Sequence, residues 1–383
     1  MRLLLLFLML MMNCVVYTQQ MEIGLFHTKK ISQVTIIPVS GEYELYGDTT
    51  FLKTINQGEV ITVSISGNLV KLVSNEAVNR KFRELKLIPK VNNSSLKYTI
   101  AGVKSRKYRD GAIFRAHKSR LKIINSVTMN NYLSGVIESE GGGGKHIEYY
   151  KVQALMSRTY ALKNLKRHEK SGFQLCDGVH CQAYHSELRF TPVISEAVAE
   201  TEGEILVDSK NKLVTTYFSA NCGGEICDAS YVWNTSVWYV QPFVDTFCVN
   251  TRQATWTKKI KKSVWKKFIE NEYGVYEENL GEWFYNFEQD QRKAFYIHPS
   301  LGIPLRDLRK KFRLKSTFFS TSLEGDYVVL EGRGFGHGVG LCQEGAMGMA
   351  NNGYNYDQIA RFYFNGLRVL DYYKDVFFQQ EVE

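Results

Sequence analysis

Residues 22–125 are a succession of short alternating apolar runs, and this pattern constrains the fold more than any other feature of the sequence. The runs QVTIIPVS, EVITVSIS and LVKLVS alternate as strands with one buried face do, and SGE, NQGE and SGN interrupt them as turns. We therefore expect an α+β protein whose N-terminal part is β-rich.

The rest of the chain mixes helical and strand patterns. Residues 147–168 predict a helix, because Val152, Leu155, Thr159 and Leu162 recur at steps of three and four. The segment SEAVAETEGEILV begins as a helix and ends as a strand, DYVVLEG is a strand and YDQIARFYFNG a helix. We predict a β-rich part over 22–125, a mixed α/β core over 126–254 and 321–370, and an inserted basic and aromatic lobe over 255–320.

The first 18 residues have the pattern of a signal peptide. Arg2 precedes the apolar run Leu3 to Met12, which is shorter than the ~20 apolar residues of a membrane span. The mature chain is expected to be exported to a periplasmic or extracellular cell-wall compartment, with no stable membrane span after cleavage near Thr18. A lipid anchor on Cys14 is the less favoured alternative, because Asn13 is not the small residue expected before a lipidated cysteine.

The charge balance indicates an anionic partner. The formal net charge is +9, which for an exported protein points to a wall polymer or a membrane surface. Clusters such as KKIKKSVWKK fit a plain basic surface equally well. We find no nucleic-acid-binding signature and expect no nucleic-acid partner.

Cysteines and histidines gather after the predicted helix. His168, Cys176, His180 and Cys181 could form a tetrahedral zinc site of two cysteines and two histidines, with His185 as a spare ligand. Cys176 and Cys181 could equally close a small disulfide, since six cysteines follow the leader and an oxidising compartment could pair them. Four protein ligands leave no open position, so this metal would be structural.

Two acids stand in front of four glycines. Glu138 lies in the strand-like run GVIES and Glu140 stands at its end, with the same parity, so alternation does not choose between them. Gly141 to Gly144 then permit close backbone approach. Lys151 and Arg158 are seven residues apart on the following helix, either as snorkelling side chains or facing a cleft that contains an acid.

Polar residues also mark two later segments. The glycine-dense stretch GRGFGHGVGLCQEGA lacks the ending of a phosphate loop and predicts a tight backbone around His337, with Gln343 nearby. In TTYFSANCGG, alternation along a strand puts Tyr217, Ser219 and Asn221 on one face. That face could be solvent-exposed, or it could line a binding groove.

The order of several blocks resembles the SpoIID/LytB-domain family, named for stage II sporulation protein D and the amidase enhancer. The blocks are YLSGVIESE, KVQALMSRTYAL, CDGVHCQAY, TEGEILV, YFSANCGGEICDASYVW and GRGFGHGVGLCQEGAMGMA, which extend from about Lys90 to Val369. The resemblance implies a lytic transglycosylase that cleaves peptidoglycan between N-acetylmuramic acid and N-acetylglucosamine. It places the catalytic acid on Glu140. The chain departs from the family at Gly141 to Gly144, where members often have Met-Pro.

The implied reaction needs one carboxyl group and no cofactor, since the C6 hydroxyl of the sugar itself attacks and leaves a 1,6-anhydro end. The resemblance also places zinc on the His/Cys cluster in some members, and Lys151 and Arg158 match its basic positions. The residues expected to bind substrate are Lys151, Arg158, Tyr217, Ser219, Asn221, His337 and Gln343.

Two other functions remain open on the sequence. The first is a non-catalytic wall-binding module that uses the same groove to stimulate a wall amidase. The second is a zinc hydrolase built on Cys176, His180 and Cys181, which is less favoured because no carboxylate stands beside them as a base.

Overall fold

A computed structural model describes residues 20–73 and 80–375 and divides the chain into two compact units, 1–132 and 133–383. The predicted signal peptide and Cys14 lie outside the described residues. In the ranges that are described, no helix combines the length and the apolar character needed to cross a membrane.

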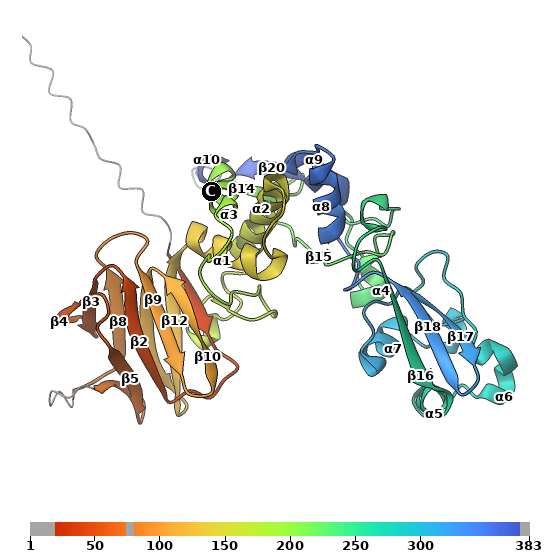
Figure 1. Cartoon of the computed structure of the whole chain (residues 1–383), viewed down its shortest axis with the longest axis horizontal. Coiled ribbons are helices and arrows are strands. Elements are labelled where there is room, and N and C mark those ends of the chain that lie inside the picture. The colour runs from red at the N-terminus through yellow and green to blue at the C-terminus, as the bar shows by residue number, and fades with distance from the viewer. Residues whose placement is uncertain (1–19, 74–79, 376–383) are drawn as a thin grey trace, which may run out of the picture. The chain divides into compact units, whose positions relative to one another are not determined.

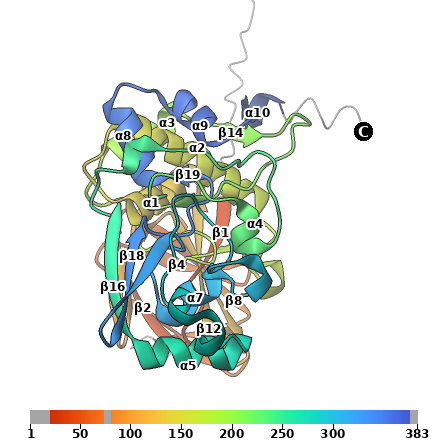
Figure 2. The same ribbon diagram turned by 90° about the vertical axis from the view of Figure 1, so that its right-hand side faces the viewer.

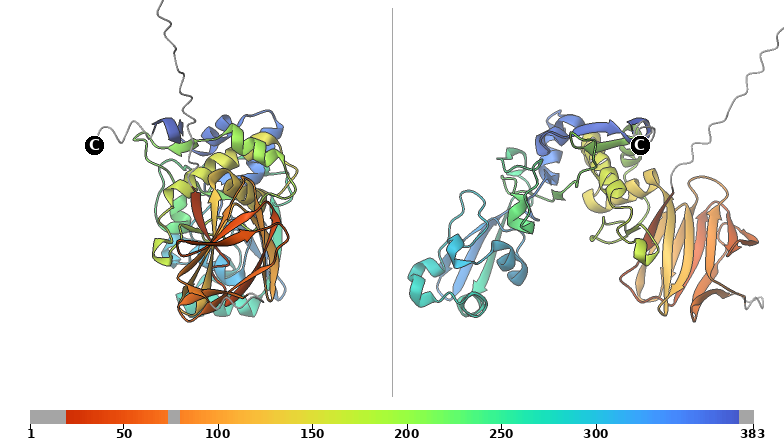
Figure 3. Two further views of the ribbon diagram at one scale, coloured as in Figure 1. Left: turned by 90° about the vertical axis from the view of Figure 1, so that its left-hand side faces the viewer. Right: turned by 180° about the vertical axis from the view of Figure 1, so that it is seen from behind.

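Unit 1 is built from two antiparallel sheets (Figure 1; Figure 3, left). One sheet has the strand order β1-β12-β11-β8-β3-β4 and the other β10-β9-β2-β5-β6-β7. The strands are β1 Gln20–Leu25, β2 Gln33–Ser40, β3 Tyr43–Gly47, β4 Thr50–Ile55, β5 Ile61–Ser66, β6 Leu69–Val73, β7 Lys81–Phe82, β8 Glu84–Pro89, β9 Ser95–Ile100, β10 Val103–Arg109, β11 Gly111–His117 and β12 Arg120–Thr128.

The two sheets of unit 1 pack through their alternating apolar faces. Strand β3 alternates strictly between buried and partly exposed positions, and β2 does so over most of its length. Buried side chains such as Ile36, Leu45 and Phe114 form the core. The prediction of a β-rich N-terminal part and an α+β fold is confirmed, although the strands continue beyond residue 125 to Thr128.

Unit 2 holds its core around helix α2, which packs against α3, α8, α9 and β14 (Figure 2). Its elements before the lobe are α1 Met129–Gly141, which starts in unit 1, α2 Ile147–Lys163, η1 Glu169–Ser171, β13 Leu175–Cys176, α3 Val193–Glu200, β14 Glu204–Val207, β15 Phe218–Ser219, α4 Ala229–Trp233 and η2 Thr246–Cys248. After the lobe come β19 Leu341–Cys342, α8 Gln343–Asn351, α9 Tyr356–Tyr363, β20 Arg368–Asp371 and α10 Tyr372–Asp375.

The inserted lobe has a three-stranded sheet of order β16-β18-β17 and an apolar core of its own, which includes Trp265 and Leu308 (Figure 3, right). Its elements are β16 Thr255–Lys261, α5 Lys262–Tyr273, α6 Glu277–Leu280, η3 Gly281–Phe284, η4 Pro299–Leu301, α7 Leu305–Phe312, β17 Phe319–Glu324 and β18 Tyr327–Arg333. The boundary expected at residue 320 cuts through β17 and leaves out β18, so the lobe's sheet extends to Arg333.

Three local predictions are wrong in ways that matter for the site. The run GVIES is the end of helix α1, not a strand. The helix predicted over 147–168 stops at Lys163, where Asn164 caps it. TTYFSANCGG forms only the two-residue strand β15, because its partner β19 is equally short.

Candidate functional site

Helix α1 carries the two acids at its C-terminal end, and a loop of residues 183–191 folds back on it. Gly135 allows this approach, because a Cβ there would clash with the carbonyl oxygen of Ser186 and the ring of Tyr184. Backbone N–H groups of the loop donate to three consecutive side chains of α1, those of Glu138, Ser139 and Glu140. The helix end and the loop therefore form one hydrogen-bonded block.

Glu138 is a structural acceptor within this block. Its carboxylate accepts from the backbone N–H groups of Arg189, Phe190 and Thr191 at 2.8–3.1 Å. It also accepts a 3.1 Å bond from Nε of Arg189 and is buried. With four donors on two oxygens, this carboxylate holds the loop and has no free position for a substrate.

Glu140 is different, because it is partly exposed and lines a pocket. Its Oε1 accepts one 2.6 Å hydrogen bond, from the backbone N–H of Ala183. Burial raises the pKa of Glu140, and the Ala183 bond only partly offsets this. A carboxyl group with a raised pKa stays protonated closer to neutral pH, which a general acid requires.

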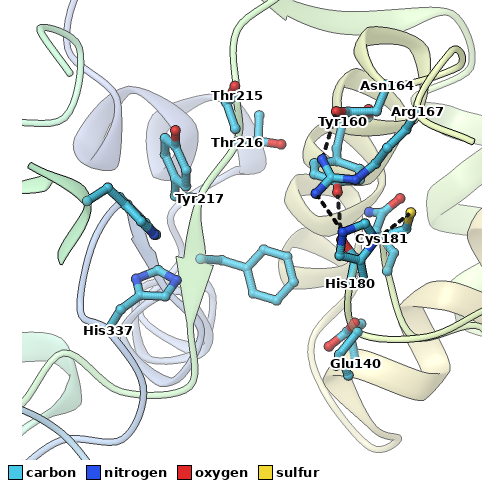
Figure 4. Close-up of a pocket in the computed structure, with 14 residues that line it drawn as sticks. Glu140, Tyr160, Asn164, Arg167, His180, Cys181, Thr215, Thr216, Tyr217 and His337 are labelled. Carbon is cyan, nitrogen blue, oxygen red and sulfur yellow. Dashed lines mark hydrogen bonds between the residues drawn. The ribbon is translucent and has the colours of Figure 1, made fainter. Parts of the chain in front are cut away.

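The pocket has a volume of about 680 Å³ and two walls (Figure 4). Glu140, Tyr160, Arg167 and His180 lie on one wall, and Tyr217 and His337 face them from the other. The other residues that line it are Asn164, Val179, Cys181, Gln182, Thr215, Thr216, Phe218 and Trp233. Two segments that are far apart in the sequence thus meet at one site.

The second wall depends on close packing between β15 and the glycine-dense loop before β19. Gly336 and Gly340 have φ of +112° and +73°, and a Cβ at either would clash with Ser219 or Tyr217. The loop carries His337 beside an aromatic group. The rings of Tyr217 and Trp233 stack at 4.6 Å, and the Trp233 ring meets His337 edge-on at 5.2 Å.

The imidazole of His337 is held neutral. Burial lowers its pKa to about 4, and the charges of Arg309 and Arg292 act in the same direction. Its Nδ1 accepts a 3.0 Å bond from the backbone N–H of Val339, so the other ring nitrogen carries the proton. A hydrogen bond to the Phe218 backbone opposes this shift only in part, so backbone contacts hold His337 in place as a neutral ring.

The structure corrects the expected positions of Lys151 and Arg158, neither of which lines the pocket. Arg158 is 2% exposed and donates to the carbonyl oxygens of Glu204 and Val198, so it braces α2 against α3 and β14. Lys151 is paired with Glu148 and Glu200 at 2.7 Å each. Helical spacing correctly put both cations on one side, but that side is covered.

Ser219, Asn221 and Gln343 were also expected in the groove, and all three are buried away from it. The Ser219 hydroxyl accepts from the N–H of Gly338. Asn221 donates to the Cys248 carbonyl and the Glu344 carboxylate. Tyr217 and His337 are the members of the predicted set that reach the pocket with Glu140.

Sequence reasoning missed two pocket residues with evident binding potential. Arg167 follows α2, and its guanidinium contacts Asn164 Oδ1 and His180 Nε2 at 3.3 Å. Trp233 ends α4 and is 41% exposed, which is unusual for so large an apolar ring beside a pocket. A signal for Trp233 was present, since it closes the block ICDASYVW, but nothing local distinguishes it from a core tryptophan.

The four predicted metal ligands come together at the edge of this pocket. The ligand atoms of His168, Cys176, His180 and Cys181 all lie within 4.8 Å of one another. Nε2 of His168 is 3.4 Å from Sγ of Cys181, and both cysteines are buried. Two thiolates and two imidazoles at such separations suit a tetrahedral zinc ion.

Comparison with known proteins finds a family model that covers part of this site. Residues 117–207 match the SpoIID model, described as stage II sporulation protein. The chain is 29% identical over 280 residues to an uncharacterized protein of Brachyspira hyodysenteriae, covering 72% of this chain and 74% of the relative. It is 26% identical over 271 residues to stage II sporulation protein D of Bacillus subtilis, covering 64% and 75%.

A further relative is the amidase enhancer of Bacillus subtilis, 24% identical over 296 residues, covering 63% of this chain and 40% of the relative. The family match includes Glu140 and the four cysteine and histidine residues, and the similarity to full-length relatives extends well beyond it. The resemblance to the SpoIID/LytB family read from the sequence blocks is confirmed by the SpoIID match and by relatives named stage II sporulation protein D and amidase enhancer.

Proposed function

We propose that this protein is a lytic transglycosylase of peptidoglycan that uses Glu140 as its single acid and base. The proposal places it in a cell-wall compartment, which agrees with the sporulation and amidase-enhancer names of its relatives. The observation that carries it is the pocket itself. Among the described residues that line the pocket, Glu140 is the one with a carboxyl group, and its pKa is raised.

A single carboxyl group distinguishes this site from an ordinary glycosidase. Retaining and inverting glycosidases place two carboxyl groups about 5 to 9.5 Å apart, one as the acid and one as the nucleophile or base. Glu138 is not a second catalytic group, because its oxygens are occupied by four donors. A reaction whose nucleophile comes from the substrate fits a lone acid.

Glu140 would act twice in this reaction. First it donates its proton to the glycosidic oxygen as the bond from C1 of N-acetylmuramic acid breaks. The C6 hydroxyl of the same sugar then bonds to C1, and its proton passes to the Glu140 carboxylate. The glycan is cut, a 1,6-anhydro ring forms, and Glu140 is protonated again without water being consumed.

The other pocket residues supply sugar contacts. The exposed ring of Trp233, stacked on Tyr217, offers an apolar face to a pyranose, and Thr215 and Thr216 offer hydroxyl groups. Arg167 offers the cation that Lys151 and Arg158 were expected to supply, suited to the carboxylate of a lactyl group or stem peptide. Neutral His337 presents its imidazole ring to the sugar from the wall opposite Glu140.

We also propose that His168, Cys176, His180 and Cys181 hold a structural zinc ion. When bound, the zinc would cross-link the segment that follows α2, and two of its ligands, His180 and Cys181, line the pocket. The ion would keep that wall in place and take no part in the proton transfers.

A non-catalytic wall-binding module is the second candidate, and one observation favours it. A relative is named as an amidase enhancer, and the aromatic wall of the pocket would grip a glycan whether or not it is cut. In that case the partner would be a wall amidase, and Glu140 would serve only in binding.

Purified glycan strands incubated with the wild-type protein and with Glu140→Gln separate the two functions. Mass spectrometry should find 1,6-anhydro ends with the wild type and none above background with the variant. Sedimentation with intact walls should be equal for both proteins. Binding by the wild type without any new glycan ends would refute the transglycosylase proposal and leave the binding module.

A further inference from the structure

A second group of potential metal ligands lies in unit 2, apart from the His/Cys cluster. The ligand atoms of Cys222, Asp245, Cys248 and Cys342 all lie within 4.8 Å of one another. Sγ of Cys222 is 3.4 Å from Sγ of Cys248 and 3.3 Å from Oδ2 of Asp245. All four side chains are completely buried.

We propose that Cys222, Asp245, Cys248 and Cys342 form a second structural zinc site. Thiolate sulfur and carboxylate oxygen are both zinc ligands in proteins, and four of them complete a tetrahedral site. Three soft sulfurs disfavour magnesium and calcium, which prefer oxygen ligands alone. No assumption about the reaction at Glu140 enters this proposal.

The surroundings of the cluster suit deprotonated ligands. The backbone N–H groups of Cys222 and Gly345 donate to Sγ of Cys342 at 3.2 and 3.3 Å. Cys342 is also the N-terminal cap of α8, where the helix dipole favours negative charge. These donors stabilise a thiolate, the form of cysteine that binds a metal.

Hydrogen bonds orient the Asp245 carboxylate as they orient ligands in metal sites. Oδ2 of Asp245 accepts a 2.9 Å bond from the hydroxyl of Tyr363, and Oδ1 accepts a 3.0 Å bond from the N–H of Phe247. Such outer contacts orient ligating side chains in metal sites. A disulfide explains this arrangement less well, because it joins two sulfurs and leaves the third sulfur unused beside a buried carboxylate.

An ion bound by this second cluster would stabilise the pocket wall that carries Tyr217 and His337. Cys222 follows β15, Cys248 lies in η2 and Cys342 lies in β19, so one ion would join three segments. Strand β19 pairs with β15 at Ser219 and Cys342, and the N–H of Leu341 donates to the carbonyl oxygen of Tyr217. Tyr217 and His337 each stand five residues before a ligand of the ion, Cys222 and Cys342 respectively.

Metal content per chain tests the proposal. Protein purified with Zn²⁺ should hold two equivalents by elemental analysis, and Cys342→Ser and Cys181→Ser should each hold one. Cys227→Ser is the matched control, because Cys227 is buried nearby but its sulfur contacts the Asp228 carbonyl and lies outside the cluster. It should keep two equivalents.

A measurement on the wild type keeps the test valid if Cys342→Ser fails to fold. The protein is unfolded with a chelator, without reductant, and treated with an alkylating reagent. Peptide mapping should then find Cys222, Cys248 and Cys342 all alkylated. A cross-linked peptide joining any two of these three cysteines, or a wild type whose entire zinc content disappears in Cys181→Ser, would overturn the second site.

Discussion

The backbone N–H of Ala183 donates a 2.6 Å hydrogen bond to Oε1 of Glu140, and this contact joins the end of α1 to the loop that follows the His/Cys cluster. One neutral donor does not compensate for the burial of a carboxylate, so the pKa of Glu140 remains raised. The loop therefore positions the acid while leaving it able to hold a proton.

The rate of glycan cleavage should fall as the pH rises through the raised pKa of Glu140, because only the protonated carboxyl can donate to the leaving oxygen. The pKa of His337 is about 4, so its imidazole adds no inflection near neutrality. The rate of release of anhydro ends, measured from about pH 4 to about pH 9, should show the fall. His337→Gln should lower the rate and leave the inflection in place. If the inflection disappears in that variant, it comes from His337 and not from Glu140.

Replacing the two acids should have opposite effects on stability. The folded-state pKa of Glu140 lies above its unfolded value, so its stabilising contribution is present below the unfolded pKa and lost as the pH rises through the folded pKa. At pH 7 Glu140→Gln should therefore be at least as stable as the wild type. Glu138→Gln should lower the free energy of unfolding by about 1–3 kcal/mol, because the NH2 group of glutamine cannot accept from the backbone N–H donors. Urea unfolding that reverses this order would contradict the assignment.

Arg158 and Arg167 should separate stability from binding. Arg158→Met removes the hydrogen bonds to the carbonyl oxygens of Glu204 and Val198 and should cost about 1–3 kcal/mol, without a change in wall affinity per folded molecule. Arg167→Met should weaken wall binding about tenfold with little change in stability, because its guanidinium lines the pocket. Thermal unfolding and sedimentation measure the two effects. If folded Arg158→Met binds walls more weakly and Arg167→Met binds them normally, Arg158 contacts the substrate, as the sequence predicted.

Trp233→Ala should weaken the binding of glycan strands about tenfold, because it removes the apolar face stacked on Tyr217. Trp283→Ala provides the control, since Trp283 is 69% exposed in the lobe and does not line the pocket. Isothermal calorimetry with purified glycan strands reports both affinities. Equal losses in the two variants would place binding on the aromatic surface in general, outside this pocket.

Removing zinc with a chelator should loosen the segment that follows α2. Amide hydrogen exchange should accelerate over residues 168–181, where the four ligands of the His/Cys cluster lie, and remain unchanged in the sheet of order β10-β9-β2-β5-β6-β7. Adding Zn²⁺ back should restore protection in the wild type but not in Cys181→Ser. Protection that is indifferent to the chelator would show that hydrogen bonds alone hold this segment.

Much of the fold follows from the sequence, because short-range periodicity reports which side of an element is buried. The alternation over 22–125 predicted the strands of unit 1, and the steps of three and four from Val152 to Leu162 predicted α2. The four ligands of the His/Cys cluster lie within one short segment, so their meeting also followed from spacing. The order of the sequence blocks revealed the resemblance to the SpoIID/LytB family.

Tertiary structure decided the rest, because periodicity does not say what covers a buried side. A strand would put Glu138 and Glu140 on one face. On a helix, the directions of side chains two positions apart differ by about 200° around the axis. One acid therefore holds the loop while the other lines the pocket. Arg158 lies on the predicted side of α2, yet that side is closed by α3 and β14. The meeting of Cys222, Asp245, Cys248 and Cys342 depends on contacts between segments far apart in the chain, which local sequence patterns do not encode.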